Sequence, residues 1–178
     1  MKYKKYFIIS IIGLFLISFL AHFIYDWFPN KFTSIFFPVN ESIWEHQKMT
    51  FTSYMIFGII EYFLLKNKDI NNFFFSLLIS SIITILLVIG IFTPIFYLMG
   101  TKDNIFITLS IYLFGIIIGK YVQYKLFEKK EYKTINIISL ILIPIIFTIF
   151  GILTYYPLHN GLFYDYNEQK YGLYSYYE

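Results

Sequence analysis

The chain has 178 residues, of which 58% are hydrophobic and 14% charged, and its mean hydropathy is +0.63. A soluble domain has about half apolar residues and rarely contains apolar runs of ~18 or more, so a soluble globular protein is excluded. The absence of cysteine excludes disulfides and thiolate sites, and a dispersed net charge of +3 argues against a nucleic-acid partner.

Apolar segments predict an all-α fold, a polytopic transmembrane helical bundle of about five spans that forms a single membrane domain over residues 1–178. A spanning helix needs about 20 residues, and lipid forces every backbone polar group to bond internally. The lipid bilayer is therefore the first expected partner. The expected elements are spans at 6–28, 47–65, 71–90 with a short or re-entrant piece at 91–99, 105–127 and 134–156, and a tail at 157–178.

The third apolar segment is too long for one straight span. Gly90, Thr93, Pro94 and Gly100 crowd its second half, and a proline there kinks or ends a helix. We expect the span to end near Gly90. A full re-crossing by the remaining piece would give six spans, but Thr101–Asn104 is a short loop for that topology.

The lysines predict the orientation of the chain. With the N-terminus in the cytoplasm, ten lysines fall on the inner side and four on the outer side, which agrees with the positive-inside rule. We therefore expect a multi-pass protein of a bacterial cytoplasmic membrane, with its C-terminal tail outside. The inner lysines are Lys2, Lys4, Lys5, Lys66, Lys68, Lys120, Lys125, Lys129, Lys130 and Lys133, and the outer ones are Lys31, Lys48, Lys102 and Lys170.

Small residues indicate close helix packing. Gly115 and Gly119 form a GxxxG pattern, which lets another helix approach, either within the bundle or in a homodimer. Ser76, Ser80 and Thr84 recur every fourth residue, a spacing typical of a packed helix face.

Glu61 and Lys120 lie at similar depth near the cytoplasmic ends of two spans. Ionisable groups within a membrane are costly and tend to pair or to extend toward the interface. We expect an ion pair or such extension, with a proton-coupling carboxylate as the alternative for Glu61.

All three histidines fall at the outer end of the expected spans. His22 lies on the same helix face as Asp26, four residues later, so we expect Asp26 to accept a hydrogen bond from one ring nitrogen of His22 and to orient the imidazole. His159 follows the last span, and the Asn160-Gly161 turn can fold the tail back over the helix ends.

The segment between the first two spans carries the densest polar pattern. Asn40 is a suitable N-cap for a helix that starts at Glu41. On such a helix Ser42 pairs with His46, and Glu41 pairs with Glu45, so that one broad polar sector results.

Imidazole and carboxylate groups are typical zinc ligands. We expect His22, His46, His159 and Asp165 to be candidate metal ligands, with Zn as the cofactor. Glu45 or Glu41 would act as general base, and Ser42 is a further candidate catalytic residue.

The sequence is compatible with two classes of function. The first is a metal-dependent hydrolase of lipid or envelope substrates. The second is a non-enzymatic membrane protein, such as a transporter subunit or an immunity-type interaction protein. The polar cluster would then be structural or would bind a ligand without turnover.

Two motifs resemble those of a family of small bacterial multi-pass membrane proteins of unknown function. The first is NES-x-WEH at Asn40–His46. The second is the terminal pattern P-x-H, LF-x-D and YG, formed by Pro157, His159, Leu162, Phe163, Asp165, Tyr171 and Gly172. The resemblance covers nearly the whole chain and implies a membrane location but no activity.

A looser resemblance is to the intramembrane zinc amidases, namely the alkaline ceramidases and the progestin and adipoQ receptors. The Ser42-xxx-His46 pattern, together with further His and Asp residues, is similar to the set of active-site residues in those proteins. Those proteins have seven spans and a His-xxx-His on the last one, whereas this chain has only His159 there. The resemblance implies a zinc hydrolase in which His22 replaces a ligand.

Overall fold

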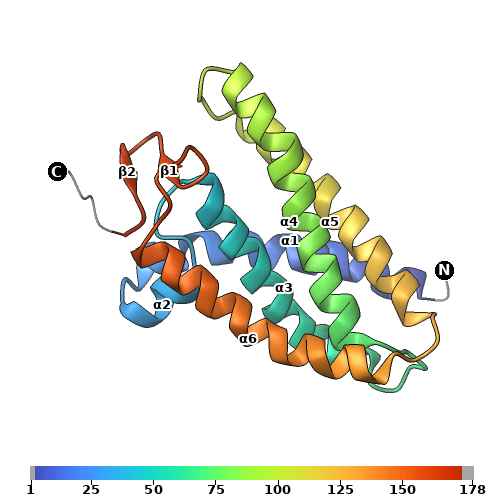
Figure 1. Ribbon diagram of the computed structural model, residues 1–178. Coiled ribbons are helices and arrows are strands. Elements are labelled where there is room, and N and C mark those ends of the chain that lie inside the picture. The colour runs from blue at the N-terminus through green and yellow to red at the C-terminus, as the bar shows by residue number, and fades with distance from the viewer. Residues whose placement is uncertain (1–2, 174–178) are drawn as a thin grey trace.

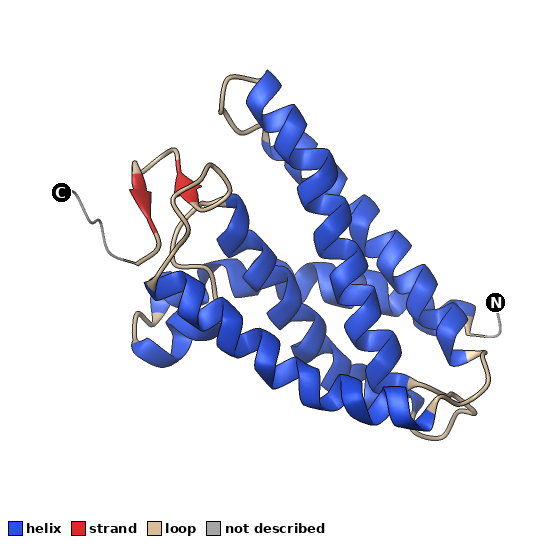
Figure 2. Cartoon of the chain, in the orientation of Figure 1, coloured by secondary structure: helices blue, strands red, loops and turns tan. Residues whose placement is uncertain are grey.

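The computed structural model describes residues 3–173 as a bundle of α-helices with a small β-hairpin at one end (Figures 1 and 2). Residues 1–2 and 174–178, which include Lys2 and the end of the expected tail, lie outside the described residues. The elements are α1 (Lys4–Trp27), α2 (Lys31–Phe36), α3 (Ile43–Leu65), α4 (Phe73–Leu98), α5 (Ile105–Phe127), α6 (Lys133–Tyr155), β1 (Tyr164–Asp165) and β2 (Lys170–Tyr171).

Four of the described helices, α1, α4, α5 and α6, are long and apolar enough to cross a membrane. This confirms the all-helical class and indicates a membrane protein. Helix α3 is different because it carries Glu45, Lys48 and Glu61, all of them buried. Helices α1 and α4 pack directly against α3, and Ser34 of α2 and Thr154 of α6 also contact its charged side chains.

Helix α4 runs without interruption from Phe73 to Leu98, so the expected break near Gly90 is wrong. Pro94 lies close to the C-terminal end of the helix, where its missing N–H removes a single bond. The chain turns only after the helix, where Gly100 takes a positive φ of 71°. Helices α4 and α5 therefore form one long hairpin (Figure 1), and Phe96 near its tip contacts Tyr166, just after β1, with ring centroids 5.4 Å apart.

Helix α3 also begins at a different residue than expected. Ser42 is its N-cap and accepts a hydrogen bond from the Glu45 amide at 3.3 Å, so the helix starts at Ile43 rather than at Glu41. Serine followed by glutamate three residues later is a common start of a helix. Asn40 instead accepts a bond from the Ser42 amide at 2.9 Å. Glu41 thus remains in the loop and does not share a helix face with Glu45.

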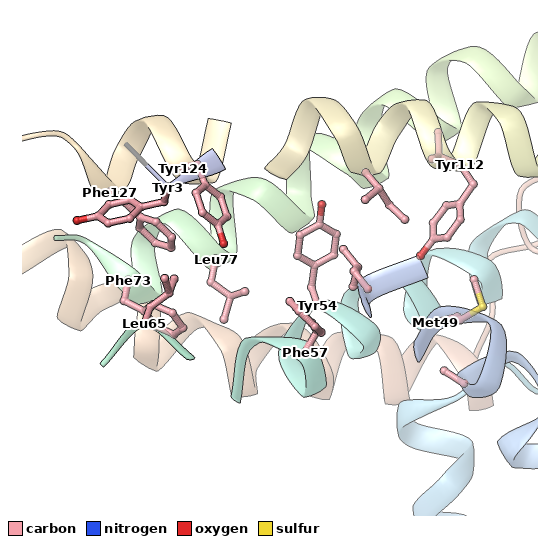
Figure 3. Packing of buried hydrophobic residues seen from close by; sticks show 14 residues of the cluster. Tyr3, Met49, Tyr54, Phe57, Leu65, Phe73, Leu77, Tyr112, Tyr124 and Phe127 are labelled. Carbon is pink, nitrogen blue, oxygen red and sulfur yellow. The ribbon is translucent and has the colours of Figure 1, made fainter. Parts of the chain in front are cut away.

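The main core joins four helices, and Figure 3 shows part of it around Tyr54, Leu77 and Tyr124. A second cluster places Phe51 of α3 against Phe150 of α6, with ring centroids 5.8 Å apart. The core thereby surrounds α3 with apolar side chains from both directions.

Small residues seat α4 against α5, as the spacing of the serines and glycines predicts. The Thr84 hydroxyl donates to the Gly115 carbonyl at 3.1 Å, and a Cβ at Gly119 would meet Thr84 and the Ser80 carbonyl. The two glycines are thus used within the chain. A homodimer through the same pair stays a prediction.

The expected Glu61–Lys120 ion pair is confirmed, with Nζ and Oε2 3.0 Å apart. Both side chains are buried, and further partners complete the carboxylate's hydrogen bonds. Gln123 and Tyr124 donate to Glu61 at 2.8 and 2.9 Å, and Ser10 of α1 donates at 2.5 Å. The network ties α1, α3 and α5 together near the N-terminal end of α1.

Replacing Lys120 by Met should destabilise the protein strongly, because it leaves the Glu61 carboxylate buried without a counter-ion. Removal of one partner from a buried pair costs about 3–5 kcal/mol. Thermal unfolding in mild detergent measures the effect, with Lys125→Met as the control at a half-exposed pair with Glu128. The double variant Glu61→Leu/Lys120→Leu should recover much of the loss. Equal melting temperatures for Lys120→Met and Lys125→Met would contradict this account.

Candidate metal centre and cavity

Polar side chains from distant parts of the sequence meet at one end of the bundle. The C-terminal end of α1, the start of α3 and the β-hairpin lie together there, opposite the described N-terminal end of the chain (Figure 1). All three histidines are toward this end, as expected from their position after or before the apolar segments. Two of them come into direct contact.

His22, Glu41 and His46 form a compact group. The two Nε2 atoms of His22 and His46 are 3.2 Å apart. The Glu41 Oε2 atom lies 3.6 Å from His22 Nε2 and 3.5 Å from His46 Nε2. His22 comes from α1, Glu41 comes from the loop before α3, and His46 comes from the first turn of α3.

Hydrogen bonding fixes the tautomer of His46. Its Nδ1 lies 2.9 Å from the Ser42 carbonyl oxygen, which can only accept, so Nδ1 carries the proton. Nε2 of the neutral ring therefore presents a lone pair to the group, as a metal ligand requires. This orientation follows from the helix itself, because Ser42 and His46 are one turn apart.

The expected hydrogen bond between His22 and Asp26 is absent. Among the described residues, the buried Nδ1 of His22 has no hydrogen-bond partner. The His22 ring turns toward α3 and meets His46, with ring centroids 5.2 Å apart. The positions of His22 and Asp26 on one face of α1 therefore do not by themselves produce a hydrogen bond between them.

Glu41 is the half-exposed member of the group, with 42% of its side chain accessible. Its polar contact with His22, followed by the proximity of His46, lowers the pKa of Glu41 against the opposing effect of burial. The carboxylate is therefore ionised at neutral pH. It brings one negative charge to the two imidazoles.

The distances within the group fit a tetrahedral ion. Zinc bonds of about 2.0–2.2 Å to nitrogen and oxygen correspond to ligand–ligand separations of about 3.3–3.6 Å. The separations of 3.2, 3.5 and 3.6 Å match this edge length closely. His22, Glu41 and His46 can therefore hold a metal ion with three protein ligands and one open position.

His159 and Asp165 do not join this group, contrary to the expected ligand set. The His159 ring stacks on Tyr171 at a centroid distance of 4.8 Å. Asp165 is fully buried and accepts backbone amides from Glu41 at 2.8 Å, Asn167 at 2.8 Å and Glu168 at 3.0 Å. Its carboxylate holds the β-hairpin turn and the backbone of Glu41 in place.

Glu45 and Ser42 also take positions other than those expected of catalytic residues. Glu45 is buried in an ion pair with Lys48, with 2.5 Å between Oε2 and Nζ, and it does not line the adjacent cavity. The Ser42 hydroxyl is the N-cap of α3. Because α3 starts two residues later than expected, Glu41 lies in the loop and reaches the histidines, whereas Glu45 on the helix packs against Lys48 and Thr154.

The Glu45–Lys48 pair ties three further segments to α3. Glu45 accepts the Val39 amide at 3.1 Å and the Thr154 hydroxyl of α6 at 2.8 Å. Lys48 donates to the Ser34 carbonyl of α2 at 2.7 Å and to Thr154 at 2.8 Å. All polar atoms of the buried pair thus have partners, as burial of charge requires.

The two sequence motifs interlock across the chain. Asn40 donates to the Gly172 carbonyl at 2.9 Å, and the Trp44 amide donates to the Leu162 carbonyl at 2.9 Å. The Trp44 ring stacks on Phe163 at 4.7 Å. Gly172 has a φ of 55°, and a Cβ there would collide with the Thr154 carbonyl. The motifs therefore build one structural unit that fixes the loop bearing Glu41.

A cavity of about 560 Å³ lies directly beside the three-residue group. Its size is typical of small-molecule sites. Helices α1, α3, α4 and α5 form its walls, and Tyr164 and Tyr166 of the β-hairpin segment complete its rim. His22, Glu41 and His46 all face this space.

Asp103 is a cavity residue that the sequence analysis missed. It comes from the loop at the tip of α4 and α5, and no local motif surrounds it. Partial burial raises the pKa of Asp103. The proximity of His46 acts in the opposite direction and lowers this pKa, whereas the nearby carboxylates of Glu41 and Asp165 raise it further. Only the packing of the α4–α5 hairpin over α1 and α3 brings this carboxyl group to the site.

The fold and the site define a helical membrane protein with a polar cluster that opens into an apolar cavity. The chain belongs to the family described as "Family of unknown function (DUF6512)", whose model matches residues 1–173. This agrees with the expected membership of an uncharacterised family. Comparison with curated proteins found no match, and comparison with solved structures found none either.

Replacing Asp165 by Ala should destabilise the protein by about 2 kcal/mol, because three backbone amides lose the buried carboxylate that accepts their hydrogen bonds. It should also release the loop that carries Glu41. Thermal unfolding measures the first effect, and protease sensitivity of residues 37–42 measures the second. Glu131→Ala, at an exposed carboxylate between α5 and α6, is the control and should change neither. An Asp165→Ala variant that melts like the control would show that the amides find other partners.

Proposed function

We propose that the protein is a membrane-embedded zinc hydrolase whose metal ligands are His22, Glu41 and His46. The observation that carries this proposal is the set of three ligand-atom separations, which are within about 0.1 Å of the edge lengths of a tetrahedral zinc site. The neighbouring cavity supports it because a catalytic metal needs an open position that faces substrate.

A zinc ion at this position would lower the pKa of a bound water to about 7 and polarise a substrate carbonyl. His46 and His22 would hold the ion through Nε2, and Glu41 would offset part of its charge. In the hydrolytic step, the water oxygen bonds to the carbonyl carbon and the bond to the leaving group breaks. The water's proton passes to the leaving group.

We assign the proton transfer to Asp103. Among the described cavity residues, Glu41 and Asp103 are the acidic ones, and Glu41 belongs to the ligand set. Glu45, the base favoured by the sequence, is neutralised by Lys48 and outside the cavity. Asp103 would accept the proton from water and return it to the departing oxygen or nitrogen.

We further propose that the N-terminus is cytoplasmic and that the site faces the outer leaflet of a bacterial cytoplasmic membrane. The distribution of lysines supports this orientation. Among the described residues, the start of α1, the α3–α4 loop and the segment from the α5–α6 loop to the start of α6 lie at the end of the bundle opposite the site, and they carry Lys4, Lys5, Lys66, Lys68, Lys129, Lys130 and Lys133. Substrates would then be lipids or envelope components reached from the outer side.

A non-enzymatic binding protein is the competing proposal. The observation that favours it is the withdrawal of Glu45 into a closed ion pair, which leaves a single acidic residue, Asp103, to act as base. In that case the cavity would bind a ligand, with or without metal, and no turnover would follow.

Metal content of the purified protein tests the ligand assignment. Protein in mild detergent should contain about one zinc per chain, and His46→Ala should lose nearly all of it, because two ligands alone hold zinc weakly. His159→Ala is the matched control and should retain the metal, since His159 stacks on Tyr171 instead. A metal-free wild-type protein, or equal zinc in both variants, would refute the site.

Turnover by an Asp103→Asn variant tests the assigned base. With p-nitrophenyl decanoate as substrate, kcat should fall by about 10²–10⁴-fold, because general base catalysis contributes that much. Zinc content should stay at the wild-type level. Asn104→Ala, which alters only the adjacent N-cap of α5, is the control. Wild-type protein that holds zinc but hydrolyses neither this ester nor the matching anilide would favour the binding protein.

A further inference from the structure

The cavity has the form of a channel parallel to the helices. On α1 it is lined at 15, 18, 19, 22 and 23, on α4 at 88, 92 and 96, and on α5 at 105, 108, 109 and 112. Each set recurs every three or four residues, so each helix contributes one continuous face. The seven helical steps from His22 to Phe15 correspond to about 10 Å along the helix axis.

The polarity of this channel changes along its length. His22, Glu41, His46 and Asp103 gather at the outer end, where the β-hairpin also lies. Below them the walls are mainly apolar, with Phe19, Phe92 and Leu109 among the lining residues, and Gln47, Thr50 and Thr108 are the polar side chains on these walls.

Hydroxyl groups at the deep end are already satisfied. The Tyr112 hydroxyl donates to Ser18 Oγ at 2.6 Å, and Ser18 donates to the Leu14 carbonyl at 2.8 Å. Tyr112 projects from α5 into the bundle in Figure 3. Such a floor requires no polar group from a ligand, so it suits the apolar end of a chain.

The channel also has lining residues that face the outside of the bundle. Phe19 of α1 is 57% exposed and Ile105 of α5 is 62% exposed, although both line the cavity. Both belong to helices long and apolar enough to cross a membrane. In a bilayer this side of the channel would therefore border lipid, which gives a hydrocarbon chain a route in without crossing water.

We infer that the cavity binds a single acyl chain of a membrane amphiphile, with its carbonyl group at His22, Glu41 and His46 and its methyl end at Tyr112 and Ser18. The placement of the polar end rests on the proposed hydrolytic site. The placement of the chain rests on the apolar channel alone. The bilayer is the source of this ligand.

The depth of the channel sets the length of the chain. Carbon–carbon bonds of about 1.5 Å in a zigzag advance about 1.25 Å each, so about 10–12 Å accommodates roughly eight to ten carbons. A substrate with a longer chain would leave its end in the surrounding lipid through the exposed side near Phe19 and Ile105.

Photocrosslinking tests the inference with decanoic acid that carries a diazirine near its methyl end. In nanodiscs, the wild-type protein should be labelled at the channel floor around Tyr112 and Val88. Leu109→Trp should reduce this labelling by about fivefold or more, because the indole fills the channel. Leu113→Trp is the matched control and should label like wild type, since Leu113 lies one turn away on α5 and is 37% exposed.

A second variant guards against a simple folding defect in Leu109→Trp. Phe92→Ala widens the channel, and it should raise floor labelling by the dodecanoic analogue relative to wild type, an effect opposite in sign to destabilisation. Equal floor labelling of Leu109→Trp and Leu113→Trp would overturn the inference. So would labelling restricted to lipid-facing residues such as Ile141 in the wild type.

Zinc measured on the same samples separates this inference from the proposed function. Floor labelling that responds to Leu109→Trp in a zinc-free wild-type protein would uphold the acyl-chain pocket and refute the metalloenzyme. Bound zinc with floor labelling that is identical in the two tryptophan variants would uphold the metal site and refute the pocket.

Discussion

The ion pair between Glu45 and Lys48 is the constraint on which the site depends. Charges buried in an apolar bundle must be compensated, and here hydrogen bonds from three other segments complete the pair. The Val39 amide, the Ser34 carbonyl and the Thr154 hydroxyl all bond to this pair. Satisfying two charges on α3 therefore fixes α2, α6 and the loop that carries Glu41.

The buried and half-buried glutamates of the bundle differ in the groups that balance their negative charge. This difference separates the carboxylates that stabilise the fold from the one that can bind a ligand. Glu61 and Glu45 each have a lysine partner and a complete set of hydrogen bonds. Glu41 has two imidazoles instead, remains half exposed and borders a cavity. A carboxylate whose hydrogen bonds are all made within the protein stabilises the fold. Glu41 and the two histidines instead have atoms that remain available to bind a metal ion. The β-hairpin supports the open group from behind through Asp165, which binds the Glu41 backbone.

Local sequence reasoning succeeded where one helix or one pair decides the outcome. Apolar runs located the long helices, the spacing of small residues located the α4–α5 contact, and similar depth located the Glu61–Lys120 pair. It failed at Glu41 and Glu45, because α3 starts two residues later than expected and Glu41 therefore lies in the loop instead of on the helix face of Glu45. It also failed at Asp103, since no local pattern records which loop a helical hairpin brings over a site.

The amino-acid sequence by itself determined the helical class, the one end of the bundle at which the histidines gather, and the two motifs that frame the site. These follow from hydrophobicity and spacing, which act over a few turns of chain. Tertiary structure alone decided that His22 and His46 meet while His159 stacks on Tyr171. It also decided that a carboxylate from a loop completes their group. Those contacts depend on the crossing of α1 over α3 and on the folding back of the tail, and such long-range packing is set by the whole core rather than by any single segment.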